Sequence, residues 1–210
     1  MTPARLFRLL AGLGLAALVG ACSLMSRNPV GPEAAAVADP LLSAWGHESS
    51  DGEVIFLHVL PAGDGDGRQL TVLYAESPKA GGAGTWYALR GHVSAVEGAP
   101  RYLNLRLVAS DPAALREIDE AHPGHADHPW SFVPYRFIDP DHLLVAGLPG
   151  GAVAEAIRQG RLAGRLGGDA GFEVAVLEDG PERIAAFLAA ADAQALFADA
   201  VAFARVKAAP

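Results

Sequence analysis

The sequence predicts an α+β fold in which an antiparallel β meander forms a curved sheet or a partly closed barrel, with C-terminal helices packed on it. Two observations support this prediction. Between residues 53 and 148, short apolar runs rich in β-branched and aromatic residues alternate with clusters of Gly, Asp and Pro, which is typical of consecutive hairpins. After residue 150, apolar residues recur at helical spacing instead. Strands followed by a helical part are typical of α+β domains.

Six segments are expected to be strands, and they lie at residues 53–60, 69–75, 85–96, 101–109, 130–138 and 142–148. The alternation is clearest in the fourth, where Leu103, Leu105 and Leu107 share one face and polar residues share the other. Residues 41–45 are predicted to add a further strand that places Trp45 at one end of the core. We therefore expect about six to eight strands in the sheet or barrel.

The last third of the chain changes character. A helix is predicted over residues 151–159, and a strand over residues 172–177. A second helix is predicted over residues 181–190. Its start is indicated by Pro181 in the first turn, and by Glu182 beside the positive end of the helix dipole.

Two apolar stripes at helical spacing follow: Ile184, Phe187 and Leu188 form the first, and Leu196, Phe197, Val201 and Phe203 form the second. We expect the first stripe to pack on the sheet or on its open end. The second stripe is interpreted as helical as well, so residues 150–206 are expected to hold about one to three helices.

The first 21 residues have the three-part layout of a secretory signal. A basic stretch with Arg5 and Arg8 precedes an apolar run at residues 9–19, and small residues precede Cys22. The apolar run is shorter than the roughly 20 residues that a membrane-spanning helix needs. We therefore predict a cleaved lipoprotein signal peptide at residues 1–21 rather than a transmembrane helix.

The tetrapeptide Val19-Gly20-Ala21-Cys22 resembles the lipobox of bacterial lipoproteins, in which an apolar residue and two small residues precede a cysteine. The resemblance implies that the Cys22 thiol is diacylated, that the chain is cut before it, and that the new amine is acylated. The alternative is an ordinary signal peptide with an incidental cysteine. The lipobox is favoured because Cys22 is the only cysteine in the chain.

The residue after Cys22 is Ser23 rather than Asp. In Gram-negative lipoproteins this resembles the pattern that is sent on to the outer membrane, which implies a lipid-anchored protein that faces the periplasm. The whole chain resembles the uncharacterised lipoproteins of Gram-negative bacteria, and that resemblance brings no assigned activity.

Residues 22–40 are predicted to be a lipidated flexible tether, because their prolines and small residues show no sustained period. Residues 41–206 are predicted to form a single β-rich domain with a helical C-terminal part, a length sufficient for one core. Cleavage would remove Arg5 and Arg8 and move the formal net charge from −8 to −10. Such an acidic chain is a poor nucleic-acid binder, so no nucleic-acid partner is expected.

A histidine-rich segment contains His122, His125 and His128, with Asp127 beside them. These residue types are ligands for zinc or copper. Interrupting Pro and Gly residues argue against a helix, so a loop would have to curl to bring the three rings together. The alternative interpretation is a polar, solvated loop between strands.

Hydrolase signatures of the G-x-S-x-G and H-E-x-x-H types are missing, so we expect no enzyme and no cofactor besides the covalent lipid on Cys22. Ser43-Ala44-Trp45 resembles the opening of lipocalin-like proteins, although Ser43 replaces the glycine of that family. No lipocalin function is carried over.

The expected role is therefore non-catalytic binding or a structural role in the cell envelope, with an envelope protein or a small apolar ligand as partner. Two alternatives stay open. The first is periplasmic metal binding through the histidine-rich segment, and the second is an enzyme of unrecognised type.

Overall fold

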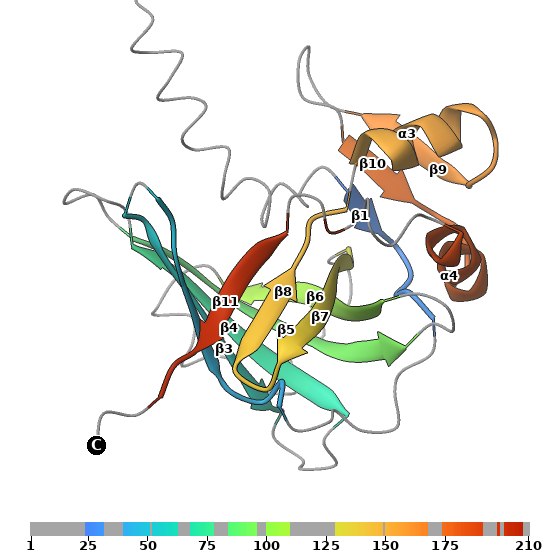
Figure 1. Cartoon of the computed structure of the whole chain (residues 1–210). Coiled ribbons are helices and arrows are strands. Elements are labelled where there is room, and N and C mark those ends of the chain that lie inside the picture. Colours follow the sequence, from blue (N-terminus) through green and yellow to red (C-terminus); the bar gives the residue numbers. More distant parts are fainter. Residues whose placement is uncertain are drawn as a thin grey trace, which may run out of the picture.

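The computed structural model describes residues 24–31, 40–50, 52–62, 68–77, 84–95, 100–109, 129–148, 150–167, 174–190, 197 and 200–207. Eight antiparallel strands close into a barrel, and a small three-stranded sheet lies with two helices outside it (Figure 1). The α+β prediction is therefore confirmed, and the barrel is closed.

Around the barrel the strands follow the order β11-β2-β3-β4-β5-β6-β7-β8. Their bounds are β2 (Ala44–Glu48), β3 (Val54–Pro61), β4 (Gln69–Ser77), β5 (Thr85–Ala95), β6 (Arg101–Ala109), β7 (Ser131–Asp139), β8 (His142–Val145) and β11 (Val201–Arg205). We call the end where β2 ends and β3 begins the upper rim, and the end where β7 turns into β8 the lower rim. The six predicted strands are all present, with small shifts at their ends.

The second apolar stripe was predicted to be helical, and this prediction is wrong for its last part. Val201 and Phe203 belong to β11, which pairs with β8 on one side and with β2 on the other. Phe203 is fully buried and Ala202 and Ala204 are exposed, which is the two-residue alternation of a strand. The stripe therefore closes the barrel and removes its free edges.

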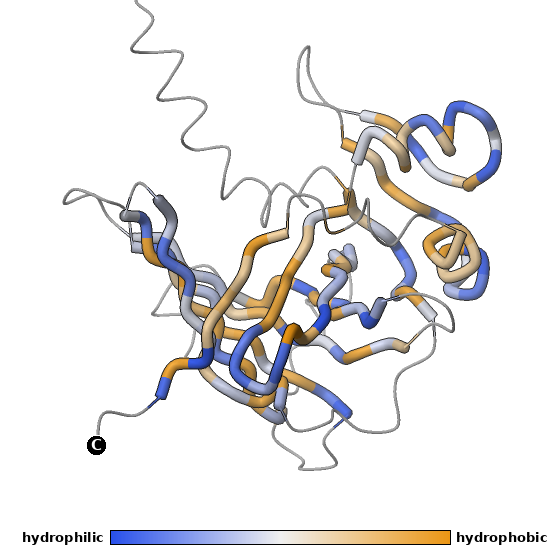
Figure 2. Tube along the Cα trace, viewed as in Figure 1, coloured by the Kyte–Doolittle hydropathy of each residue, from blue (hydrophilic) through white to orange (hydrophobic). Residues whose placement is uncertain are grey.

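Inward-facing side chains occupy the barrel interior. Trp45, Tyr135 and Phe203 are at most 1 % exposed, and they belong to one cluster with apolar residues from all eight strands. The indole Nε1 of Trp45 donates a hydrogen bond to the carbonyl oxygen of Leu41 at 3.1 Å. Figure 2 shows hydrophobic residues along strands such as β8 and hydrophilic residues in the β7–β8 turn. Burial of these side chains is the main stabilising term for the barrel.

The outer cap is our name for the small sheet and the two helices that lie against the wall of β6 and β7. Its sheet has the order β1-β10-β9, with β1 parallel to β10. The bounds are β1 (Leu24–Ser26), α3 (Gly150–Arg158), β9 (Gly164–Gly167), β10 (Val174–Leu177) and α4 (Pro181–Ala189). Within the described residues, no helix has the length and apolar composition to cross a bilayer.

A second apolar core lies between the outer cap and the barrel. Ile184 and Leu188 of α4 share it with Tyr102 of β6 and Phe132 of β7. The helix begins at Pro181 after an extended Gly180, as the sequence predicts. The first apolar stripe therefore packs on the outer face of the sheet rather than on an open end.

The structure differs from the predicted tether at residues 24–31. Leu24, Ser26 and Val30 are at most 2 % exposed, and Leu24–Ser26 form β1. The sequence shows no sustained period here because β1 is only three residues long and its partner β10 lies far along the chain. Residues 22–23 and 32–39 of the predicted tether lie outside the described residues.

Candidate functional site

Two glutamates and two tyrosines come together at the upper rim. The inward-facing row of β4 runs through Leu70, Val72 and Tyr74 and continues to Glu76. Glu53 directly precedes β3, and its backbone N–H donates to Ser49 Oγ at 3.0 Å in the turn after β2. These elements place two carboxylates at the end of an otherwise apolar interior.

The contacts within this group set its protonation. The Tyr74 hydroxyl donates to Glu76 Oε2 at 3.4 Å, and the rings of Tyr74 and Tyr87 are 5.9 Å apart. Burial, a side-chain hydrogen bond with Glu53 and the charge of Glu53 together raise the pKa of Glu76 from 4.5 to about 7, against a smaller lowering by the hydrogen bond from Tyr74. Burial and the nearby Glu76 also raise the pKa of Tyr74 above its ordinary value. Glu76 is therefore partly protonated near neutral pH.

This carboxylate pair makes stability depend on pH. The folded-state pKa of Glu76 is raised to about 7. The contribution of protonated Glu76 to the free energy of unfolding is therefore fully present below pH 4.5 and is lost as the pH rises to about 7. We expect Glu76→Gln to reduce this loss of stability with rising pH. At pH 8 it should raise the free energy of unfolding by about 1–2 kcal/mol, a value reduced for solvent screening at the rim.

Urea unfolding at several pH values measures this effect. Glu48→Gln is the matched control, since Glu48 lies exposed at the same rim. An unchanged pH slope in Glu76→Gln would show that Glu76 does not have this raised pKa.

On the outer wall of the barrel, the Trp130 ring contacts the side chains of Arg106 and His92. The guanidinium carbon of Arg106 lies 4.0 Å from the centre of the Trp130 ring, and the His92 ring meets the indole edge-on at 5.2 Å. His92 is only 6 % exposed. Stacking of this kind fixes the indole position. Trp130 also connects the barrel to β1. Its backbone and that of Ser26 exchange two hydrogen bonds, of 2.8 and 2.7 Å.

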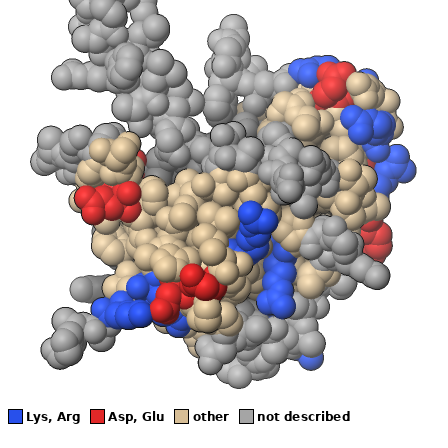
Figure 3. Space-filling model, viewed as in Figure 1, with Lys and Arg blue, Asp and Glu red and all other residues tan. Residues whose placement is uncertain are grey.

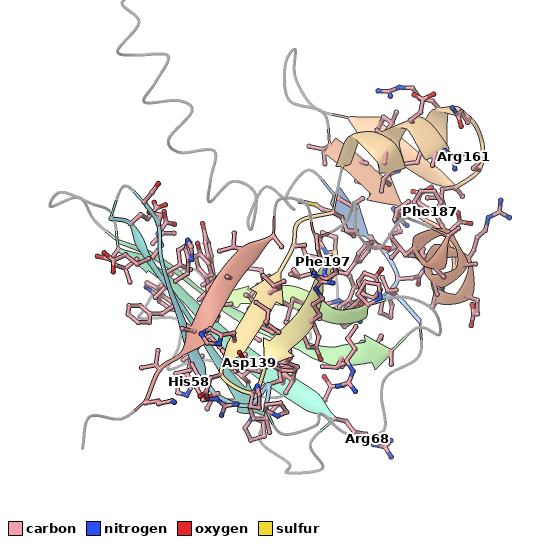
Figure 4. The ribbon with its side chains drawn as sticks, in the orientation of Figure 1. His58, Arg68, Asp139, Arg161, Phe187 and Phe197 are labelled. Atoms are coloured by element: carbon pink, nitrogen blue, oxygen red, sulfur yellow. The ribbon has the colours of Figure 1, made fainter. Side chains whose placement is uncertain are left out.

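The other described histidines have local roles. His47 Nδ1 lies 2.9 Å from the carbonyl oxygen of Ala202, and its ring lies 5.6 Å from that of Phe203. His142 Nδ1 lies 2.9 Å from the carboxylate of Asp139, and this hydrogen bond lowers the pKa of Asp139. Figure 4 shows Asp139 at the β7–β8 turn and His58 on the outside of the barrel. These histidines are thus strand residues on the outside of the barrel or at its ends.

The predicted site residues lie elsewhere in the chain. Cys22, His122, His125 and His128 are all outside the described residues. In the part of the chain that the structure describes, no group of three or more His, Cys, Asp or Glu residues is placed to hold a metal ion. Lipidation of Cys22 and metal binding by the three histidines stay predictions.

On the face seen in Figure 3, charged residues lie at the edges, and Lys and Arg residues also lie near the middle. At the lower rim Lys207 pairs with Asp141 at 2.8 Å. On the outer cap Arg165 pairs with Glu178 at 2.7 Å, and Arg161 lies over the ring of Phe187 at 5.6 Å (Figure 4). Lys207, Arg165 and Arg161 thus each have a local partner.

Comparison of the chain with protein-family models, with curated proteins and with solved structures found no match.

Proposed function

We propose that this chain is a lipoprotein of the bacterial cell envelope, anchored through a diacylated Cys22 and facing the periplasm from the outer membrane. The observation that carries the proposal is the lipobox at residues 19–22, placed directly after a basic and an apolar segment. Two or three acyl chains hold a protein on a bilayer far more firmly than one chain does. The anchor would therefore be stable.

The barrel is proposed to act by non-catalytic contact with another envelope protein. A small apolar ligand would need room inside the barrel, and the interior is occupied by large side chains such as Trp45, Tyr135 and Phe203. The carboxylate pair at the upper rim has no described histidine bonded to it, and the His142–Asp139 pair lies exposed at the lower rim. These observations favour a binding or structural role over catalysis.

The anchor is tested by metabolic labelling with a fatty-acid analogue. We expect the wild-type chain to be labelled and to fractionate with membranes. Cys22→Ala should lose all label, because no other thiol is present to form the thioether. Native mass spectrometry of the purified wild-type protein should show the covalent lipid and no further small molecule.

The control is Ser23→Ala, which leaves the acylated thiol in place and should be labelled like the wild type. Continued labelling of Cys22→Ala would contradict the anchor. A small molecule that co-purifies in stoichiometric amount would contradict the proposed protein partner.

A further inference from the structure

The residues that follow the proposed lipidation site are built into the fold. Leu24 is 2 % exposed, and Ser26 and Val30 are fully buried. Leu24 also belongs to the second core, together with Phe132 of the barrel and Ile184 of α4. This segment is therefore packed from both the barrel side and the cap side.

Hydrogen bonds fix the same segment at several points. The Arg27 amide donates to the carbonyl oxygen of Leu177 at 3.0 Å, which continues the pairing of β1 with β10. The Val30 amide donates to Oδ1 of the buried Asn104 on β6 at 2.7 Å. With the two bonds between Ser26 and Trp130, these contacts tie residues 24–31 to both β10 and the barrel wall.

The covalent chain between the lipid and this fixed segment is very short. Cys22 precedes Leu24 by two residues, which span at most about 7 Å when fully extended. A flexible spacer of the length expected from sequence, residues 22–40, would have a root-mean-square span of about 25 Å. The Cys22 backbone must then lie within about 7 Å of Leu24, so the acyl chains would enter the bilayer close to the surface of the fold.

The position of β1 indicates which part of the fold would lie next to the membrane. Ser26 bonds Trp130, which directly precedes β7, so β1 lies beside the upper rim. Figure 1 shows β1 near the end of β8 and the start of β11, with the end of β11 at the opposite side of the barrel. We infer that the lipid on Cys22 holds the barrel directly against the bilayer, with the near edge of the small sheet facing the headgroups and the lower rim pointing away.

The charges of the small sheet fit this orientation. Among the described residues, its near edge is formed by Leu24, by Val174 and by Gly167, which pairs with Val174. Glu178 lies at the other end of the same sheet, where it pairs with Arg27 and Arg165. In this orientation these ion pairs stay in water.

Cysteine accessibility tests this inference, which rests on the proposed lipidation. In the lipidated chain the Cys22 thiol is consumed, so an introduced cysteine is the only reactive thiol. Gly167→Cys reports on the near edge, and a Cβ there meets no atom within 4 Å, so the variant should fold. Ile138→Cys reports on the lower rim, where the side chain is 59 % exposed. The reagent is a polymer-linked maleimide too large to enter the headgroup layer.

In isolated membranes we expect Gly167→Cys to be protected and Ile138→Cys to be labelled fully. After solubilisation in detergent both should be labelled. A Gly/Ser insertion of about 20 residues between Ser23 and Leu24 should restore labelling of Gly167→Cys in membranes, because it supplies the missing spacer. Full labelling of Gly167→Cys in membranes without the insertion would overturn the inference. Failure of the lipidation itself would be seen separately, as loss of fatty-acid label and of membrane fractionation in the same variants.

Discussion

Gly91→Ala is expected to destabilise the barrel by more than about 3 kcal/mol, and the variant is expected to be largely unfolded. Gly91 lies in β5 opposite Leu105 of β6. A Cβ at this position would lie 1.7 Å from the carbonyl oxygen of Asn104 and 2.8 Å from its carbonyl carbon. Both atoms belong to the backbone of a central strand, so neither can rotate away. Relief would require β5 and β6 to separate, which would break their hydrogen bonds and open the core.

Urea unfolding followed by tryptophan fluorescence measures this effect. Gly167→Ala is the matched control, since it also places a methyl group on a strand but meets nothing within 4 Å. We expect the control to change the free energy of unfolding by less than about 1 kcal/mol. If Gly91→Ala unfolded at the same urea concentration as the control, β5 and β6 would not approach this closely.

The sequence predicts the local elements of this fold well, because their signals are local. The alternation of leucines in β6 and the Pro181 start of α4 depend on near neighbours, and both elements lie where they are expected. Closure of the barrel depends on pairing between β8 and β11, which are far apart in sequence. Val201 and Phe203 fit helical spacing as well as strand alternation, so only their long-range partners decide between the two.

The upper-rim carboxylate pair was missed for a related reason. The predicted strand at residues 69–75 ends one residue before Glu76, which continues the inward row of Leu70, Val72 and Tyr74. An acidic residue at an inward position is a usable sequence signal once the strand is extended by one residue. Its partner Glu53 comes from the turn before β3, and no pattern within either segment brings the two together.

The close approach of β5 and β6 at Gly91 also affects where the N-terminal segment, residues 24–31, is attached. Without a Cβ, Gly91 lets β6 approach β5 at Asn104. The Asn104 side chain lies on the outer face of this wall, where it accepts the hydrogen bond of the Val30 amide. The geometry of the barrel wall therefore sets where the segment after Cys22 is attached. In the proposed lipoprotein, that attachment sets how the barrel sits on the membrane.

Asn104→Leu is accordingly expected to cost about 3 kcal/mol of stability and to release the N-terminal segment. Asn104 is fully buried; its Oδ1 accepts from the Val30 amide at 2.7 Å, and its Nδ2 donates to Ser94 Oγ at 2.9 Å. Leucine has a similar volume but no polar atoms, so it would leave the Val30 amide and the Ser94 hydroxyl buried without these partners. Each buried group that loses its partner costs about 1–3 kcal/mol.

Two measurements separate the attachment of the segment from general stability. Urea unfolding gives the total cost, and limited proteolysis under native conditions should show cleavage within residues 24–31 of Asn104→Leu at urea concentrations where the barrel is still folded. Ser94→Ala is the control, because it removes one hydrogen bond of Asn104 but keeps the bond to Val30, and it should cost only about 1 kcal/mol. If both variants lost equal stability and residues 24–31 stayed resistant in both, the Asn104–Val30 bond would not hold this segment. The cap core around Leu24 and Ile184 would then be sufficient to fix the residues after the lipid.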